Sequence, residues 1–311
     1  MFLVLFCYKK MCLQFTKQCN MSYEWIKKLP QYVHQIWFDF NDTSVFTHDH
    51  CKLVSHTQSM ALNYGFKYKL WSLCDAEDFI KKKYPYYYNF FKSPITFNII
   101  KCDFFRLLLM YHFGGIYIDI DFYVIKSFND LFTDPDILFY DIDNSIVEDK
   151  NNCKILMFEE WYNSSNLDDK YSIEGSFHNG ILCSVSKRES FWIEICNHIQ
   201  IYGKNVKNTH DVWKVSGTNK LKNMFIQNND KKHFFYCKYY VACPFRCVSI
   251  ATEEIMECKS PNDKPINSSE SYWMSYTLSF LENLHDVRLF FDSSAVVCID
   301  IPSGSLWLNK V

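Results

Sequence analysis

Two aspartates stand two positions apart inside an apolar, aromatic segment. The segment GGIYIDIDFYVI, residues 114–125, has the composition of a buried strand, yet it carries Asp119 and Asp121. Side chains at alternate positions of a strand point to the same face, so the two carboxylates would lie side by side there. Like charges that lose their solvation together repel each other, and this pattern therefore requires a compensating partner.

A divalent cation is the partner that suits two carboxylates best. Mg²⁺ and Mn²⁺ prefer hard oxygen ligands and commonly take one or two protein carboxylates, while phosphate oxygens and water complete the shell. Asp119 and Asp121 fall near the end of the predicted strand, and open α/β sheets bind ligands beyond the carboxyl ends of their strands. An isolated D-x-D is more often a turn cap beside a solvated carboxylate, so the surrounding residues must decide.

Three other polar features could share the same pocket. Asp103 and Arg106 lie three apart on one face of a predicted helix, either as a structural ion pair or as a clamp for a polyhydroxylated ligand. Trp37, on a predicted first strand, could stack on a nucleobase or belong to the core. Asn179 lies in a polar break, residues 178–180, that either forms a plain turn or places an amide beside a ligand.

The elements that must position these residues alternate between strand and helix. The patterns predict strands at 32–40, 66–71, 114–125 and 136–143, and helices at 48–63, 74–84 and 98–113. Beyond residue 150 they predict strands at 171–177, 180–185 and 234–243, a helix at 188–202, and a surface excursion at 220–232. This alternation predicts an α/β fold with an open, helix-covered sheet.

Composition narrows the class of protein. A chain of 311 residues with 48% hydrophobic residues can bury a core as one large domain or two joined halves, and a formal charge of −2 argues against a general nucleic-acid binder. The fourteen cysteines include no C-x-x-C pair, which indicates reduced, mostly buried thiols. Cys243 and Cys247 could form half of a zinc site, but no second pair with suitable spacing follows them.

The start of the chain and its residue usage bear on location and origin. The apolar run in MFLVLFCYKK is too short to span a bilayer and precedes its lysines, which is the wrong order for a signal peptide. We therefore expect a cytoplasmic protein, in a host cytoplasm or viral factory if viral, with peripheral membrane contact left open. Abundant Phe, Tyr, Ile, Lys and Asn resemble the codon bias of AT-rich genomes such as those of large DNA viruses.

Taken together, these motifs resemble the DXD-containing sugar transferases of glycosyltransferase family 32. That family includes yeast Golgi mannosyltransferases and bacterial capsule enzymes, with the clostridial toxin glucosyltransferases as distant relatives. LPQYVHQIW resembles the opening I-P-x-x-I-H-x-I-W, and CDFFRLLLMYHFGGIYIDIDF resembles the core S-D-x-x-R…Y-x-x-G-G-x-Y-x-D-x-D. HNGILCS is similar to its N-x-x-x-x-S segment, and VSGT, residues 215–218, to its T-G-P loop. The resemblance covers residues 29–218.

The resemblance implies a GT-A fold, in which a Rossmann-like half with a mixed central sheet merges with an acceptor-binding half. Residues 1–28 would be a poorly defined extension, and residues 29–311 one domain with a nucleotide-sugar half at 29–150 and an acceptor half at 151–311. Trp37 would stack on the base and Tyr117 would line the nucleotide pocket. Asp119 would meet the ribose and the metal shell, and Asp121 would bind Mn²⁺ or Mg²⁺ directly.

The implied reaction moves a sugar from a UDP- or GDP-sugar to a glycan or protein acceptor with retention of configuration. Asp103 and Arg106 would hold hydroxyls of the donor sugar, and Asn179 would lie close to its reacting face. No residue stands out as the nucleophile of a double displacement, so front-face attack by the acceptor hydroxyl is the preferred mechanism.

This chain departs from the family pattern at two places. Cys102 replaces the usual Ser before the aspartate of the core block. Near the C-terminus, where relatives carry His and Ser-Trp to complete the metal and phosphate shell, this chain offers SYWMSY, residues 271–276. Ser275 with Tyr276, or His285, would have to substitute.

Two other classes of protein compete with the transferase. A degenerate relative would bind a sugar nucleotide without turnover, which the incomplete C-terminal block favours. Haloacid-dehalogenase-like phosphatases also place a D-x-D at a strand end, but they need Thr or Val two positions after the second aspartate, where this chain has Tyr123.

Overall fold

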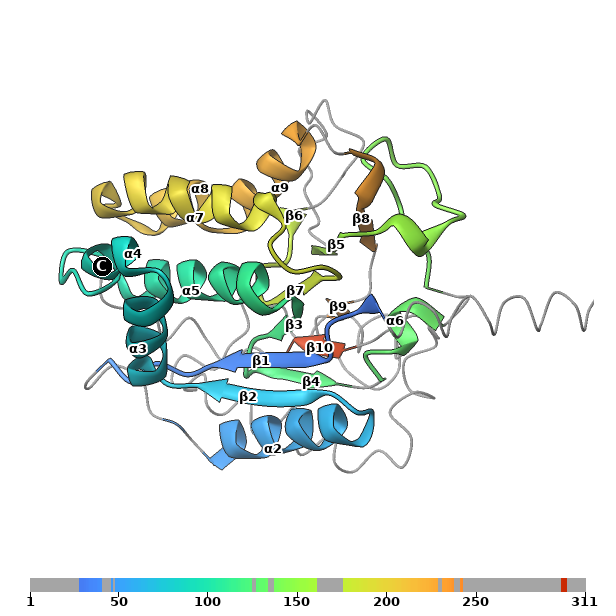
Figure 1. Cartoon of the computed structure of the whole chain (residues 1–311), viewed down its shortest axis with the longest axis horizontal. Helices are drawn as coiled ribbons and strands as arrows, with labels where there is room; N and C mark the ends of the chain where they lie inside the picture. Colours follow the sequence, from blue (N-terminus) through green and yellow to red (C-terminus); the bar gives the residue numbers. More distant parts are fainter. Residues whose placement is uncertain are drawn as a thin grey trace, which may run out of the picture.

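A mixed α/β fold is formed by the residues that the computed structural model describes, namely 28–40, 46, 48–124, 127–133, 137–160, 176–228, 231–237, 241–242 and 298–300 (Figure 1). Several predictions fall outside these residues. They concern the N-terminal extension, the Cys243 and Cys247 pair, the block at 271–276, and His285. No helix among the described residues is long and apolar enough to cross a membrane.

The main sheet has seven strands in the order β2-β1-β3-β7-β5-β6, with β8 beside β5. The strands β1, β2 and β3 are parallel, whereas β7 runs antiparallel to both β3 and β5. The predicted α/β class with a mixed central sheet is therefore confirmed. Their bounds are β1 Tyr32–Ile36, β2 Lys67–Trp71, β3 Gly115–Ile118, β5 Ile155–Glu160, β6 Ser176–Phe177, β7 Ile181–Ser184 and β8 Phe234–Cys237.

Helices cover both faces of this sheet. In Figure 1, α2 lies on one side of β1 and β2, while α5 and α7 lie on the other. Along β3, Ile116 and Ile118 belong to one buried apolar cluster and Tyr117 to the other, as strand alternation requires. The helices are α2 His48–Asn63, α3 Leu73–Lys83, α4 Pro85–Phe91, α5 Asn98–Phe113, α6 Asp130–Thr133, α7 Ser190–Tyr202, α8 Thr209–Val215 and α9 Thr218–Gln227.

The segment that carries the paired aspartates forms two strands rather than one. After β3 the chain turns and enters β4, Phe122–Val124, which belongs to a second sheet with β10, Cys298–Asp300, and β9, Val241–Ala242. The turn is held by the Asp119 N–H, which donates to the Gly180 carbonyl at 2.7 Å. The prediction that Asp119 and Asp121 share one face of a single strand is therefore wrong.

The predicted strand at 136–143 is also wrong over its described residues. Asp141 caps a tight turn in which its side chain accepts the N–H groups of Asp143 and Ser145 at 3.0 and 2.8 Å. Asn144 takes the left-handed conformation there, with φ of 63°. Because the chain reverses so soon, only isolated bridges form, from Tyr140 to Ile146 and Tyr236.

The second half of the chain holds further differences from the sequence prediction. The expected surface excursion at 220–232 is mostly the helix α9, because Leu221 and Phe225 pack into the core. Neither β5 nor α4 was predicted; Pro85, which follows the helix predicted at 74–84, begins α4. The helices α2 and α5 have the predicted bounds.

The glycine pair after α5 sets the angle between that helix and β3. Gly114 and Gly115 both have positive φ, of 64° and 83°. A Cβ at Gly115 would lie only 2.4 Å from the Tyr32 carbonyl oxygen on the neighbouring strand. Glycine is therefore required here both for its backbone conformation and for the close approach of β1 and β3.

Replacing Gly115 with Ala tests this constraint. We expect Gly115→Ala to lower the free energy of unfolding by more than about 2 kcal/mol, because left-handed strain and a backbone clash add together. Gly65→Ala is the matched control, since Gly65 has φ of 82° with no other atom within 4 Å of its added Cβ. Equal losses for the two variants in urea unfolding would show that strand approach plays no part.

Candidate functional site

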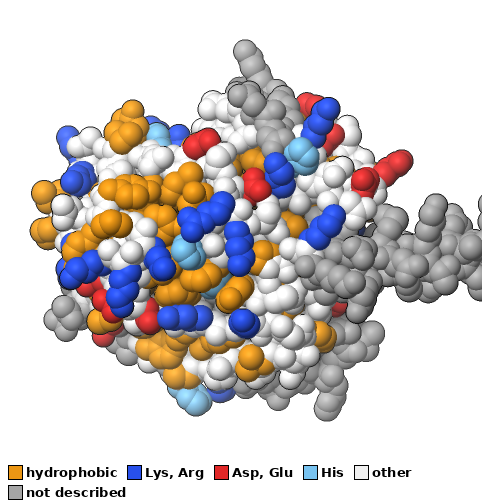
Figure 2. All heavy atoms as spheres, viewed as in Figure 1, with side chains coloured by type: hydrophobic (Ala, Val, Ile, Leu, Met, Phe, Trp, Pro, Cys, Tyr) orange, Lys and Arg blue, Asp and Glu red, His pale blue; other side chains and the backbone are white. Residues whose placement is uncertain are grey.

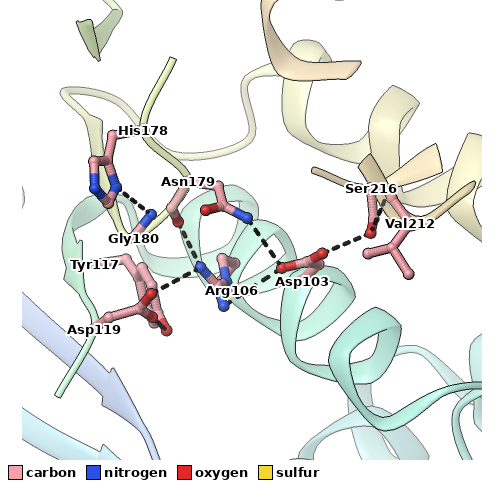
Figure 3. A network of polar contacts seen from close by, with 9 residues as sticks. All are labelled: Asp103, Arg106, Tyr117, Asp119, His178, Asn179, Gly180, Val212 and Ser216. Atoms are coloured by element: carbon pink, nitrogen blue, oxygen red, sulfur yellow. Dashed lines mark hydrogen bonds and ion pairs between the residues drawn. The ribbon is translucent and has the colours of Figure 1, made fainter. Parts of the chain in front are cut away.

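The guanidinium of Arg106 joins three segments of the chain (Figure 3). Its Nη1 donates to the Asn179 carbonyl oxygen at 2.6 Å and to Asp119 Oδ2 at 3.2 Å. Its Nη2 lies 3.4 Å from Asp103 Oδ1, one turn earlier on α5. Because Arg106 is only 5% exposed, this one buried cation fixes the α5 face, the end of β3 and the β6–β7 turn together.

Asp119 is held on both carboxylate oxygens while part of it stays accessible. Arg106 donates to Oδ2, and the buried Tyr117 hydroxyl donates to Oδ1. Its carbonyl oxygen also accepts a hydrogen bond from Gln35 Nε2 on β1 at 3.1 Å. Since 29% of the Asp119 side chain remains exposed, the carboxylate is oriented by the protein and open to a ligand.

Asp103 is the buried end of the same network. Ser216, between α8 and α9, donates from Oγ to Asp103 Oδ2 at 2.6 Å. Asn179 donates from Nδ2 to Asp103 Oδ1 at 3.3 Å. The sequence prediction that Asp103, Arg106 and Asn179 would serve one site is therefore matched by their direct contacts, although their catalytic role stays a prediction.

Burial and charge set the protonation of this network. Burial raises the pKa of Asp103 from 3.8 to about 6, and Asp119 adds to the rise while Arg106 and Ser216 oppose it. Burial alone would lower the pKa of Arg106, but the neighbouring carboxylates reverse this and keep it a cation. Burial and the Asp119 charge raise the pKa of Tyr117, so its hydroxyl keeps the proton that it donates.

Gly180 leaves the space that the Asp119 carboxylate occupies. A Cβ at position 180 would lie 2.8 Å from Asp119 Oδ2 and 2.9 Å from the Phe122 ring. The Gly180 N–H donates to His178 Nδ1 at 3.0 Å, which closes the turn against the carboxylate. Any side chain here would have to displace the aspartate.

Trp37 lies at the same edge of the sheet as Asp119. It follows β1 directly, as Asp119 follows β3, and these strands are parallel. Its half-buried ring packs against Phe46 and His50, with centroids 5.0 and 5.3 Å away. An aromatic group thus stands beyond the carboxyl ends of the strands, where a ligand of an open α/β sheet binds.

The turn residues have the chemistry, though not the full ligand set, of a divalent metal site. Asp119 and the half-buried Asp121 are hard oxygen donors, and Asp119 uses two of the roughly four lone-pair positions of a carboxylate. Within the described ranges, no three His, Cys, Asp or Glu side chains gather as metal ligands. Asp119 and Asp121 could supply two ligands of one divalent cation, and its remaining ligands would have to come from elsewhere.

Sequence reasoning missed three members of this site. Ser216 contacts Asp103, and the only signal for it was the weak VSGT similarity. Gln35 fixes the Asp119 carbonyl and is itself held by the Tyr68 hydroxyl at 2.7 Å, for which no pattern gave a signal. Gly180 lay within the polar break at 178–180, but its role depends on the close approach of β3.

Comparison with known proteins finds a family model that is similar to the first part of the chain. Residues 16–138 match the family model described as "Glycosyltransferase sugar-binding region containing DXD motif". The resemblance inferred from the sequence is thereby confirmed over this part of the chain, which is similar to the sugar-binding region of DXD glycosyltransferases.

Particular relatives match over shorter segments. The chain is 28% identical over 98 residues to inositol phosphoceramide mannosyltransferase 1 of Schizosaccharomyces pombe, covering 31% of this chain and 29% of that protein. It is 37% identical over 60 residues to mannosyl phosphorylinositol ceramide synthase SUR1 of Saccharomyces cerevisiae, covering 19% and 15%. The match thus spans less than a third of these relatives. PaToxG glycosyltransferase aligns in structure with a TM-score of 0.39 and 16% identity, over 70% of this chain and 77% of that one.

Removing the buried cation should destabilise the whole fold. We expect Arg106→Met to lower the free energy of unfolding by about 3–5 kcal/mol, because it leaves Asp103 and Asp119 without a counter-charge. Lys82→Met is the matched control, since Lys82 pairs with Asp78 at the surface and should cost less than about 1 kcal/mol. Similar losses in urea unfolding would contradict the central place of Arg106.

The raised pKa of Asp103 predicts how stability depends on pH. The folded protein keeps a proton that the unfolded chain releases between pH 3.8 and about 6. The neutral carboxyl therefore contributes stability that is complete below pH 3.8 and lost as the pH rises through about 6. As the pH rises across this window, we expect the unfolding free energy of wild type to fall by about 3 kcal/mol relative to that of Asp103→Asn, which does not titrate there. A difference that is constant with pH would contradict the shift.

Proposed function

We propose that this protein transfers a sugar from a UDP- or GDP-sugar to an acceptor hydroxyl, with retention of configuration. The observation that carries the proposal is the Asp119 carboxylate, which Tyr117 and Arg106 orient at the carboxyl end of β3 while it stays partly exposed. The family match over residues 16–138 supports the reaction class. Arg106 and Asn179 beside this carboxylate supply further polar groups for a sugar.

Asp121 would hold a Mn²⁺ or Mg²⁺ ion, with Asp119 next to it. When bound, such an ion neutralises the charge that develops on a departing nucleoside diphosphate. Tyr117 and Arg106 keep the Asp119 carboxylate in one orientation, so that it meets the ribose and the metal shell without reorganising. Since Tyr117 is only 1% exposed, we assign it to holding Asp119.

Arg106 would position the donor sugar, and Asp103, which is only 1% exposed, would hold Arg106 in place. The Arg106 Nε is buried and has no hydrogen-bond partner among the described residues, so its N–H group is still to be satisfied. Holding a sugar in one orientation lowers the entropy cost of reaching a reactive geometry. Asn179, linked to Asp103 and Arg106, would lie near the reacting carbon, and Trp37 would stack on the base.

The names of the matched yeast relatives suggest which donor and acceptor to try first. Both names contain mannosyl transfer and an inositol phosphate-bearing ceramide. We therefore include mannose as the donor sugar, and inositol phosphoceramide as an acceptor beside glycans and proteins. Because the matches cover so little of those relatives, the donor and the acceptor must be identified from the product of the transfer reaction.

Nucleoside diphosphate release separates this function from its alternatives. With Mn²⁺ and a panel of UDP- and GDP-sugars, we expect one donor to release its nucleoside diphosphate, and Asp121→Asn to slow this release at least about 100-fold. The chain offers a matched control in a second D-x-D, because Asp143 is exposed on a surface turn. Asp143→Asn should leave the rate unchanged.

Other outcomes would overturn the proposal. Tight donor binding by calorimetry without any release would define a sugar-nucleotide-binding protein. Phosphate released from monoesters would define a phosphatase. Inverted configuration of the product, seen by NMR, would refute retention while leaving the transfer itself intact.

A further inference from the structure

A group of exposed cations lies on β2, at the end of α3 and between β7 and α7. On the side of the molecule seen in Figure 2, Lys and Arg side chains lie among hydrophobic ones. We call this set the basic face; it comprises Lys67 and Lys69 on β2, Lys83 at the end of α3, and Lys187 and Arg188 between β7 and α7.

Aromatic rings draw these cations together from distant parts of the chain. Lys67 Nζ and Lys187 Nζ lie 5.5 and 5.7 Å from the centroid of the same ring, that of Tyr32. The Arg188 guanidinium carbon lies 5.0 Å from the centroid of Tyr111. Both tyrosines are partly exposed, so the basic face combines surface charge with accessible aromatic edges.

Arg188 is held on this face at a cost in backbone energy. It has φ of 66°, in the left-handed region that disfavours any residue with a Cβ. Its N–H donates to the Tyr111 carbonyl at 2.8 Å, and its Nη1 donates to the Tyr84 hydroxyl at 2.9 Å. Glycine at this position would relieve the backbone strain. The backbone conformation alone therefore does not explain why an arginine stands there.

The carboxylates beside these five cations include Asp75 and Glu189, the latter next to Arg188 in the sequence. Lys69 pairs with Asp75 at 2.9 Å, while Lys67, Lys83, Lys187 and Arg188 have no ion-pair partner among the described residues. The nearby histidine adds no charge, since burial, followed by repulsion from three of these cations, lowers the pKa of His112 to about 4. The face therefore carries a net positive charge at neutral pH.

We propose that the basic face docks on a membrane surface that contains anionic phospholipids. Lysine and arginine are attracted to such a surface, and tyrosine rings favour the depth of the lipid headgroups. The cations come from several elements and form a broad face, which suits a sheet of headgroups. This inference does not depend on the proposed sugar transfer.

The same residues are less suited to nucleic acid. Single strands bind through bases that stack on open aromatic faces. Here Lys67 and Lys187 both lie over Tyr32, and Arg188 lies over Tyr111, so that the ring faces already contact cations. Phosphate and carboxylate groups of lipids can reach the cations without displacing them from the rings.

Vesicle binding tests the proposal. We expect the full chain to sediment with vesicles of phosphatidylserine and phosphatidylcholine, to stay in solution with phosphatidylcholine alone, and to bind more weakly in high salt. At about 1 kcal/mol for each charge, the double variant Lys67→Gln, Lys187→Gln should bind roughly 25-fold more weakly. The matched control Lys207→Gln, Lys214→Gln removes two exposed charges elsewhere and should bind as wild type.

A single variant keeps the test independent of folding. Arg188→Gly relieves the left-handed strain but loses the contacts with Tyr84 and Tyr111, so its thermal stability should stay close to that of wild type while vesicle affinity falls about five-fold. Unchanged affinity for Arg188→Gly and the double variant, or binding to single-stranded RNA without binding to vesicles, would overturn the proposal. Asp121→Asn should keep full vesicle binding, which separates this result from the fate of the sugar-transfer proposal.

Discussion

One buried guanidinium organises this protein. Arg106 lies inside the apolar body of α5, yet it contacts the carboxylates of Asp103 and Asp119 and the carbonyl of Asn179. A cation buried so deeply is tolerated only where charge and geometry are matched around it. These contacts fix the helix, the end of β3 and the β6–β7 turn relative to one another. They also fix the position of the partly exposed Asp119 carboxylate.

The order of the elements makes this contact possible. Only Gly114 separates α5 from β3, which begins at Gly115, and the positive φ values of these two glycines turn the chain from the helix into the strand. Side chains on α5 and at the strand end then meet across a short distance. The antiparallel β7 brings Asn179 and Gly180 to the same point from the other side.

Local patterns predicted the first half of the fold and much of the site. The helices α2 and α5 and the glycine pair were predictable because periodicity and backbone conformation are properties of neighbouring residues. The break between β3 and β4 was not, since it depends on Gly180 accepting the Asp119 N–H and on a partner strand far along the chain. The roles of Ser216 and Gln35 were not predicted for the same reason, because each depends on a contact between residues far apart in the sequence.

The short strand β10 has a consequence for how the site is made. It pairs with β4, so that Asp300 lies in register with Phe122, the residue that follows Asp121. The chain must therefore be synthesised through residue 300 before the aspartate turn gains its neighbouring strand. Because such long-range closure is slow, the turn that carries Asp121 is expected to reach its final structure late in biosynthesis, after the contacts of Arg106 have formed.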